Sequence, residues 1–289
     1  MVVKKVGVIG CGLMGHGIAQ VAAQAGCTVV VRETEQAALD KGLSRIRKSL
    51  DKLVEKEKLT RADADAAAAR LSGTLDLKPL ADCDLVIEAI VENLGVKQKL
   101  FAELGRLCKP AAIFASNTSS FSIAELGAAS GRPQRMVGLH FFNPVQLMKL
   151  VEVVRSRQTS EDAFAEAKAF GEACGKVPVA ASDTPGFVVN RLLVPYLAEA
   201  IRMVERGDST PADIDAGMTL GCGYPMGPFT LLDYVGLDTT LFILQGWQAL
   251  EPGDPLFSPP KLLVDKVKAG KLGRKSGEGF FKWEGDKRA

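Results

Sequence analysis

A histidine and a glutamate on either side of a predicted turn are the residues best placed to move a proton. His140 ends an apolar run over residues 136–140, and Glu152 lies inside a second apolar run over 150–154. Between them Asn143-Pro144 predicts a turn, because proline disfavours helix at the preceding residue. Runs this apolar are typical of buried strands. Two such strands joined by a short connection can bring the two side chains within hydrogen-bonding distance.

This pair could act as an acid–base couple. An imidazole held at one nitrogen by a carboxylate keeps its other nitrogen available for proton transfer near neutral pH. A glutamate inside a buried strand is also costly unless it has a partner. Sequence alone therefore leaves two interpretations open, a catalytic pair or a satisfied structural pair.

A glycine-rich turn near the start of the chain predicts a dinucleotide site. A predicted strand over residues 5–9 runs into a G-x-G-x-x-G motif, and an apolar helix follows to about residue 25. The first glycine permits the tight turn, the second lets a pyrophosphate approach, and the third allows close packing of helix on strand. The residues expected to bind the cofactor here are Gly10, Gly12, Leu13, Met14 and Gly15.

An acid after the next predicted strand indicates which dinucleotide binds. Glu33 follows the strand over residues 28–31 at the distance expected for a residue that binds the adenosine ribose. Its carboxylate would repel a 2′-phosphate, so it favours NAD. The adjacent Arg32 leaves NADP open, because arginine is the residue that accepts the 2′-phosphate.

The order of predicted elements indicates an α/β fold. Strands over 84–89, 112–116 and 176–181 alternate with helical segments, which predicts a mostly parallel, doubly wound Rossmann-type sheet. After Pro185-Gly186 the pattern is helical. We therefore expect a dinucleotide-binding domain over 1–184 and an all-helical C-terminal domain over 185–289. The large apolar content of the helical part predicts a homodimer formed through it.

Polar and basic residues gather where such a fold binds ligands. Residues 117–120 follow a predicted strand and could be hydrogen-bond donors to ligands or simply a turn. The predicted helix over 35–58 carries Lys48, Lys52 and Lys56 along one face. That face is either solvated or a binding surface for an anionic ligand.

Composition excludes several classes of protein. The chain has 289 residues, 47% of them hydrophobic and 24% charged, which is typical of a soluble globular protein. A net charge of +2 argues against a dedicated nucleic-acid binder. No apolar run reaches the ~20 residues of a membrane span, and no secretory signal precedes the glycine motif. Six scattered cysteines make no zinc motif, so we expect no metal, reduced thiols and a cytoplasmic protein.

Together these segments resemble the L-3-hydroxyacyl-CoA dehydrogenases, and the chain is most similar to the stand-alone bacterial 3-hydroxybutyryl-CoA dehydrogenases. The resemblance covers essentially the whole chain in order. The segments that carry it are 10–15, 86–93, 116–120, 140–144, 183–191, 223–228 and 272–280.

The resemblance implies a role for each matching residue. His140 would be the general base and Glu152 the carboxylate that orients it, while Ser119 and Asn190 would polarise the substrate. The residues that would contact NAD, besides the glycine loop, are Glu33, Glu92, Lys97, Ser119, Asn143 and Lys275. The basic helix face, with Lys48, Lys52 and Lys56, would bind the phosphate end of CoA.

Two other functions compete with an acyl-CoA dehydrogenase. One is a related dehydrogenase of a free sugar acid such as gulonate, for which the basic helix face would have no purpose. The other is a non-catalytic, crystallin-like dinucleotide-binding protein. The presence of His140, Glu152, Ser119 and Asn190 argues against that second alternative.

Overall fold

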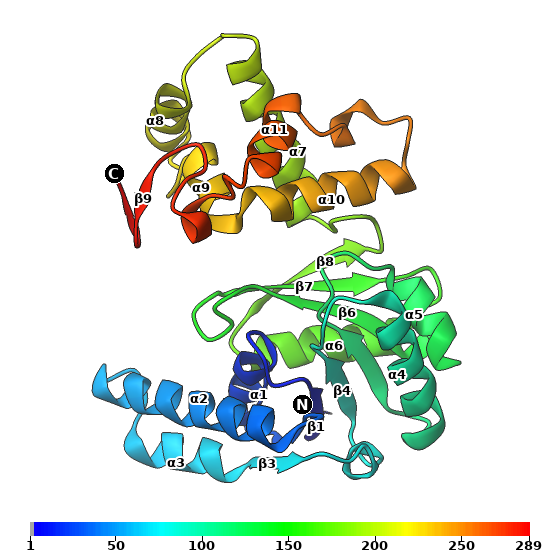
Figure 1. Cartoon of the computed structure of the whole chain (residues 1–289). Coiled ribbons are helices and arrows are strands. Elements are labelled where there is room, and N and C mark those ends of the chain that lie inside the picture. Colours follow the sequence, from blue (N-terminus) through cyan, green and yellow to red (C-terminus); the bar gives the residue numbers. More distant parts are fainter. Residues whose placement is uncertain (1–2) are drawn as a thin grey trace. The chain divides into compact units, whose positions relative to one another are not determined.

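The computed structural model describes residues 3–289, and the chain divides into two compact units after residue 187 (Figure 1). Each unit is described by itself below. The domain boundary expected after residue 184 stays a prediction.

In the described part of the first unit, eight strands form one sheet in the order β3-β2-β1-β4-β5-β6-β7-β8. All neighbouring strands are parallel except β6 and β7. The expectation of a doubly wound, mostly parallel α/β sheet is therefore confirmed. The strands are β1 (Lys5–Ile9), β2 (Thr28–Arg32), β3 (Leu71–Thr74), β4 (Leu85–Glu88), β5 (Ile113–Ser116), β6 (Met136–Phe141), β7 (Leu150–Arg155) and β8 (Val177–Ser182).

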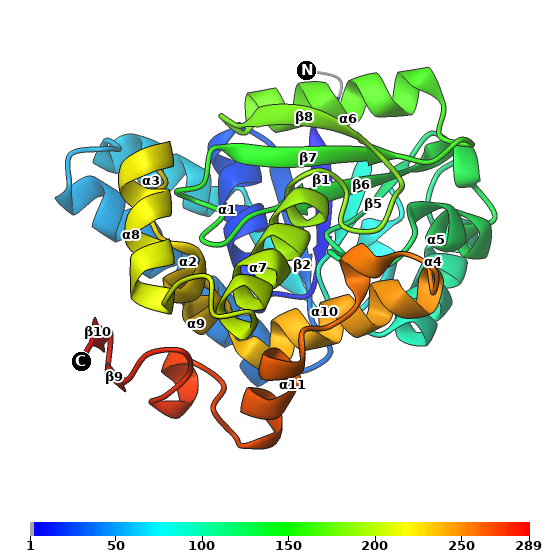
Figure 2. The same cartoon turned by 90° about the horizontal axis from the view of Figure 1, so that it is seen from above.

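Helices cover both faces of this sheet (Figure 2). The helices of the first unit are α1 (Gly15–Gln24), α2 (Gln36–Glu55), α3 (Arg61–Ala69), α4 (Leu94–Leu107), α5 (Ile123–Ser130) and α6 (Glu161–Ala173). One buried core joins α1, α2, α3 and α6 to alternate residues of the strands. On the opposite face α4 and α5 pack together, and Ile123 of α5 lies over Gly138 of β6. Strands buried on both faces explain the continuous apolar runs in the sequence.

The antiparallel pair β6–β7 sets the position of the predicted acid–base couple. His140 lies directly opposite Glu152 in the register of the two strands. Leu139 and Val153 point into the core shared with α1 and α6. Because side chains alternate along a strand, His140 and Glu152 share the other face.

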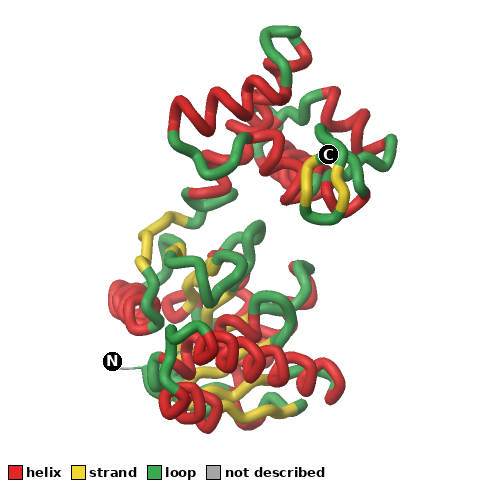
Figure 3. Tube along the Cα trace, turned by 90° about the vertical axis from the view of Figure 1, so that its left-hand side faces the viewer, coloured by secondary structure: helices red, strands yellow, loops and turns green. Residues whose placement is uncertain are grey.

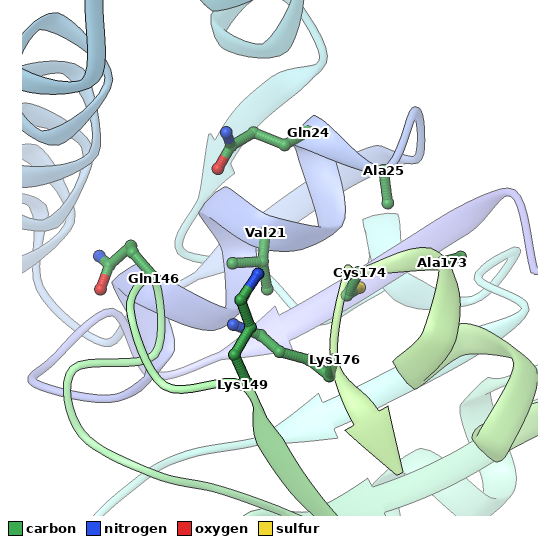
Figure 4. Close-up of a pocket in the computed structure, with 9 residues that line it drawn as sticks. Val21, Gln24, Ala25, Gln146, Lys149, Ala173, Cys174 and Lys176 are labelled. Atoms are coloured by element: carbon green, nitrogen blue, oxygen red, sulfur yellow. The ribbon is translucent and has the colours of Figure 1, made fainter. Parts of the chain in front are cut away.

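A lysine side chain fixes the connection between β6 and β7, residues 142–149, by hydrogen bonds to its backbone. Lys176, just before β8, donates from its ammonium to the backbone oxygens of Val145 and Met148. Figure 4 shows Lys176 and Lys149 beside a hollow bordered by α1, Gln146 and Cys174. Burial lowers the pKa of Lys176. Its hydrogen bonds to carbonyl oxygens account for its place in the fold, and the hollow holds none of the predicted site residues.

The second unit is built on a separate helical core. It contains α7 (Val189–Glu205), α8 (Pro211–Cys222), α9 (Pro228–Val235), α10 (Leu237–Leu250) and α11 (Lys261–Lys268). Leu197, Phe229 and Trp247 are among the residues buried between these helices. The expectation of a helical C-terminal part after the Rossmann-type sheet is confirmed.

The sequence patterns missed two small features. The edge strand β3 is only four residues long and half exposed, so it lacks the apolar run that marks the other strands. Near the C-terminus β9 (Trp283–Glu284) and β10 (Lys287–Arg288) form a short antiparallel pair (Figure 3). Gly285 opens its two-residue turn with a φ of 61°, as a type II′ turn requires.

Across residues 3–289, none of the helices combines the length and the apolar character needed to cross a membrane.

Candidate active site

Three side chains form a line of hydrogen bonds at the carboxyl end of β6. His140 Nδ1 lies 2.6 Å from Glu152 Oε2, and His140 Nε2 lies 2.8 Å from Ser119 Oγ. An ionised carboxylate can only accept a hydrogen bond, so this contact assigns the ring proton to Nδ1. Nε2 is then left as an acceptor, which is the state that a general base needs.

The imidazole lies in a largely water-excluded setting. His140 is 5% exposed and Glu152 is fully buried. The ring centroids of Phe142 and Phe187 lie 4.7 and 5.6 Å from that of His140. A buried carboxylate beside the ring stabilises an imidazolium more strongly than it would in water, because the local dielectric is low.

The loop after β5 is shaped to present Ser119. Asn117 Oδ1 accepts from the N–H of Phe141 at 2.9 Å, which ties the loop to β6 beside His140. Thr118 Oγ1 accepts from the N–H groups two and three residues further on, at 3.1 and 3.0 Å. These polar residues, a possible simple turn from sequence, thus hold Ser119 against the imidazole.

The glycine loop has the geometry that a pyrophosphate requires. Gly10 has a φ of 91°, and a Cβ on Gly15 would lie 1.8 Å from the oxygen of Gly10. A Cβ on Gly12 would meet no described atom within 4 Å. The fold itself therefore requires glycine at the first and third positions, while the close approach of a ligand explains the second.

The start of α1 is open to an anion. The helix begins at Gly15, after Met14, with no capping side chain among the described residues, and the adjacent Leu13 is 64% exposed. Unpaired N–H groups at a helix N-terminus bind phosphate. Glu33 lies against this loop, because its Oε1 accepts from the N–H of Cys11 at 2.5 Å. The loop and Glu33 can thus hold the pyrophosphate and ribose of NAD.

Arg32, which would favour NADP where Glu33 favours NAD, is held by a contact with the backbone. Its Nε donates to the backbone oxygen of Leu75 at 3.3 Å. It lines a hollow of about 470 Å³ together with Lys78 and Arg106.

Two residues expected to contact NAD are joined to each other. Lys97 Nζ lies 2.9 Å from Glu92 Oε2 and 2.7 Å from Glu88 Oε1. The Lys97 side chain is only 2% exposed, whereas that of Glu92 is 36% exposed. The roles of Glu92 and Lys97 in NAD binding stay predictions.

The lysines expected to bind CoA phosphate line one pocket. This pocket of about 410 Å³ lies between α2 and residues 144–147 of the β6–β7 connection. Its cationic lining residues are Arg45, Lys48, Lys52, Lys56 and Lys58. His16 and Ser49 also line it, and no carboxylate is among its described lining residues. Such a pocket suits an anion of several charges.

The remaining expected site residues lie elsewhere in the chain. Asn143 is exposed in the β6–β7 connection. Asn190 lies in the first turn of α7, and Lys275 pairs with Asp238 at 2.6 Å, both within the second unit. Their expected roles stay predictions.

The described residues contain no cluster of metal-ligating side chains and no disulfide. Among residues 3–289 no three His, Cys, Asp or Glu side chains are grouped to hold a metal ion. All six cysteines are free thiols. Burial, together with the nearby Glu33 carboxylate, raises the pKa of the Cys11 thiol to about 12, so it stays protonated at neutral pH.

Sequence reasoning missed three residues that shape the site. Glu88 ends β4 and anchors Lys97. Asp183 accepts from Ser122 Oγ and from two N–H groups at the start of α5. Phe187, beside His140, has a φ of 52°, an uncommon conformation for a bulky residue. The signals were a charged residue in an apolar strand and the Pro-Gly break that precedes Phe187.

Family models match nearly the whole chain. The NAD binding domain of 3-hydroxyacyl-CoA dehydrogenase matches residues 5–184, and the C-terminal domain of the same family matches residues 186–283. The chain belongs to the 3-hydroxyacyl-CoA dehydrogenase family. It is therefore an NAD-dependent oxidoreductase of the class that its motifs resemble.

Individual members of the family are similar over their full length. A probable 3-hydroxybutyryl-CoA dehydrogenase of Deinococcus radiodurans is 52% identical over 96% of this chain and 100% of its own. The mitochondrial hydroxyacyl-coenzyme A dehydrogenase of Rattus norvegicus is 50% identical over 98% and 92%. The crystal structure of (S)-3-hydroxybutyryl-CoA dehydrogenase from Ralstonia eutropha, 42% identical, superposes with a TM-score of 0.94 over 98% and 99% of the two chains.

Proposed function

We propose that this dehydrogenase oxidises (S)-3-hydroxyacyl-CoA, with 3-hydroxybutyryl-CoA as the substrate, and catalyses the reverse reduction of acetoacetyl-CoA. The observation that carries the proposal is the Ser119–His140–Glu152 line of hydrogen bonds, at the same carboxyl edge of the sheet as an NAD-binding glycine loop. The full-length similarity to proteins named 3-hydroxybutyryl-CoA dehydrogenase supports the choice of substrate.

In this proposal His140 and Glu152 form an acid–base dyad. His140 Nε2 takes the proton of the 3-hydroxyl group as the C3 hydrogen leaves as hydride. Glu152 holds the ring through Nδ1 and stabilises the imidazolium that forms. In the reverse direction the imidazolium returns the proton to the substrate oxygen. NAD, when bound, supplies the hydride acceptor.

Ser119 and the basic pocket account for substrate binding. Ser119 Oγ already lies where it can donate to an oxygen bound at His140 Nε2, so it would stabilise negative charge on that oxygen. Lys48, Lys52 and Lys56 would bind the phosphates of CoA in their shared pocket. The polarising role of Asn190 and the NAD contacts of Asn143 and Lys275 remain proposals that rest on the resemblance.

The alternatives predict different behaviour. A free sugar acid would leave the five cations of the basic pocket without a phosphate to bind. A crystallin-like protein would not need the buried dyad, which costs solvation energy to maintain. We also propose a homodimer formed through the helical unit, which the exposed apolar side chains of that unit support, and a cytoplasmic location, which the bacterial relatives support.

The deciding experiment is NADH consumption with acetoacetyl-CoA, with NADPH run beside it. Loss of NADH absorbance on a timescale of seconds would support the reaction and the substrate together. Preference for NADPH would mean that Arg32 outweighs Glu33. No turnover with folded protein that still binds NADH would favour the sugar-acid or non-catalytic alternative.

A further inference from the structure

A buried cluster of two carboxylates and one ammonium lies beneath the Ser119 loop. Glu88, at the end of β4, is fully buried, and Lys97 of α4 is 1% exposed. Lys97 Nζ bridges Glu88 Oε1 at 2.7 Å and Glu92 Oε2 at 2.9 Å. The N–H of Ile90 also donates to Glu88 Oε1, at 2.8 Å. Nothing in the proposed reaction uses Glu88.

One route of hydrogen bonds leads from Glu88 into the loop directly. Ser116 Oγ, at the end of β5, donates to Glu88 Oε2 at 2.6 Å. Ser116 Oγ also accepts from the N–H of Thr118, at 3.2 Å. Glu88 therefore orients Ser116, and Ser116 orients the backbone next to Ser119.

A second route reaches the same loop through the ion pairs. Lys97 holds Glu92, and Glu92 Oε1 accepts from Thr118 Oγ1 at 2.5 Å and from the N–H of Ser119 at 3.2 Å. Ser119 Oγ in turn lies 2.8 Å from His140 Nε2. Both routes start at Glu88. The first ends at the backbone of Thr118, and the second ends at Ser119, the residue that contacts the imidazole.

Stability alone is a poor reason for such a cluster. Taking charges out of water costs about as much as a buried ion pair returns, and apolar replacements are often no less stable. A fully satisfied buried network does, however, fix the geometry of what it contacts. The Lys97 ammonium, held between two carboxylates, belongs to this network.

We propose that Glu88 is a positioning residue, which sets the place of Ser119 against His140 through Ser116 and through the Lys97–Glu92 bridge. This inference rests on the proposed dehydrogenase function. A shift of ~1 Å in a positioned group can cost ~10²-fold in rate.

A double-mutant cycle in kcat tests the proposal. Glu88→Gln keeps the side-chain volume but removes the charge that holds Lys97, and we expect kcat for acetoacetyl-CoA to fall by roughly 10- to 100-fold. In a Ser119→Ala background the same substitution should lower kcat by less than about threefold, because the group that it positions is gone. Equal losses in both backgrounds, or no loss in either, would overturn the proposal.

A matched control separates positioning from general destabilisation. Asp84 lies at the other end of β4, where it pairs with Lys109 at 2.6 Å. Asp84→Asn removes a carboxylate directly before the same strand and should leave kcat within about twofold, well below the positioning effect. If Glu88→Gln does not fold, Ser116→Ala breaks the first route alone. It should lower kcat in the same Ser119-dependent way, and equal losses with and without Ser119 would again count against the proposal.

Nitrogen-15 NMR of the histidine rings gives a readout that does not need turnover. The chain has two histidines, so His16 serves as an internal reference for His140. Ser119→Ala should shift the His140 Nε2 signal, Glu88→Gln should shift it in the same direction, and Asp84→Asn should not. An unmoved signal in Glu88→Gln would refute the positioning role. Absence of acetoacetyl-CoA reduction by the unsubstituted protein would refute the proposed function instead, with the NMR result still deciding the role of Glu88.

Discussion

At the scale of single residues, the proposed proton transfer depends on which nitrogen of His140 can accept a proton. Glu152 binds Nδ1, so the nitrogen that faces Ser119 is the one able to accept a proton. The carboxylate thereby sets both the ring orientation and the tautomer.

We expect His140→Gln to lower turnover by ~10²–10⁴-fold, the usual contribution of a general acid–base group. NADH binding should persist, because the glycine loop and Glu33 do not depend on the imidazole. Steady-state kinetics and NADH fluorescence titration measure the two quantities. If turnover stays within a few-fold of that of the unsubstituted enzyme, His140 and Glu152 are a structural pair and not an acid–base dyad.

Glu152→Gln should lower kcat of the same reaction while the protein stays folded. Without the carboxylate, the imidazole loses the acceptor that fixes its orientation and its tautomer through Nδ1. We expect kcat to fall by at least about tenfold, measured by steady-state kinetics. An unchanged kcat in a folded variant would indicate that Glu152 has only a structural role.

The dyad could be predicted from sequence because two strands and one turn suffice to place it. The Ser119 contact was implied only by the resemblance, since it joins strand ends far apart in the chain. Glu88 was not predicted at all. In the sequence, Glu88 is only a charged residue at the end of an apolar strand. Its contacts with Ser116 and Lys97 become visible in the structure.

At the scale of elements, α2 connects the cofactor site with the basic pocket. Gly42 of α2 packs directly on the glycine loop, because a Cβ there would lie 2.2 Å from Cys11 Sγ. Further along the helix, successive turns present the pocket lysines. The helix therefore holds both regions in one rigid frame.

Lys52→Ala should raise the KM for acetoacetyl-CoA by about three- to tenfold with little change in kcat, as the loss of one exposed charge pair predicts. The effect should shrink as salt concentration rises. Lys41→Ala is the control, since Lys41 is exposed on the same helix but does not line the pocket. Similar KM values for the two variants would contradict a role of the pocket in CoA binding.

The amino end of β4 predicts an acid-sensitive contribution to stability. Burial would raise the pKa of Asp84, but hydrogen bonds from Lys109 and from the N–H groups of Lys5 and Lys4 outweigh it and lower the pKa below 3.8. A carboxyl with a lowered pKa stabilises the fold above its unfolded pKa and loses that contribution as pH falls through its folded pKa.

We therefore expect Asp84→Asn to destabilise the protein by about 1 kcal/mol at pH 7. The difference in Tm from the unsubstituted protein should narrow below about pH 4, where Asp84 is protonated in the unfolded chain. Thermal unfolding at both pH values tests this. A constant difference across the range would mean that the charge of Asp84 does not matter.

At the scale of the whole molecule, the apolar surface of the helical unit supports self-association. Leu192 of α7, Leu220 of α8 and Phe242 of α10 are 72%, 87% and 67% exposed. Light scattering should give twice the chain mass of 30.8 kDa. Among single substitutions of these three residues by Asp, at least one should yield monomers. Leu75→Asp, at an exposed residue of the first unit, is the control, and a monomeric unsubstituted protein would contradict the prediction.

The sheet, its helices and the helical unit followed from hydrophobic patterns because each long element repeats its own period. The strands β3, β9 and β10 did not, since β3 is half exposed and has no apolar run, while β9 and β10 have only two residues each. The basic pocket could be predicted only in part. The spacing of its lysines was visible, but Lys58 and the border at residues 144–147 come from the fold of the chain around α2.

Because β6 and β7 are antiparallel, the proposed catalytic pair does not depend on the residues that connect the two strands. Both partners stand on paired strands, and residues 142–149 between them carry neither. The same residues border the basic pocket through Pro144, Gln146 and Leu147. If the pair and the pocket act as proposed, substitutions in this connection would change substrate preference and leave His140 and Glu152 in register. An inserted residue inside either strand, by contrast, would turn one partner to the opposite face of the sheet.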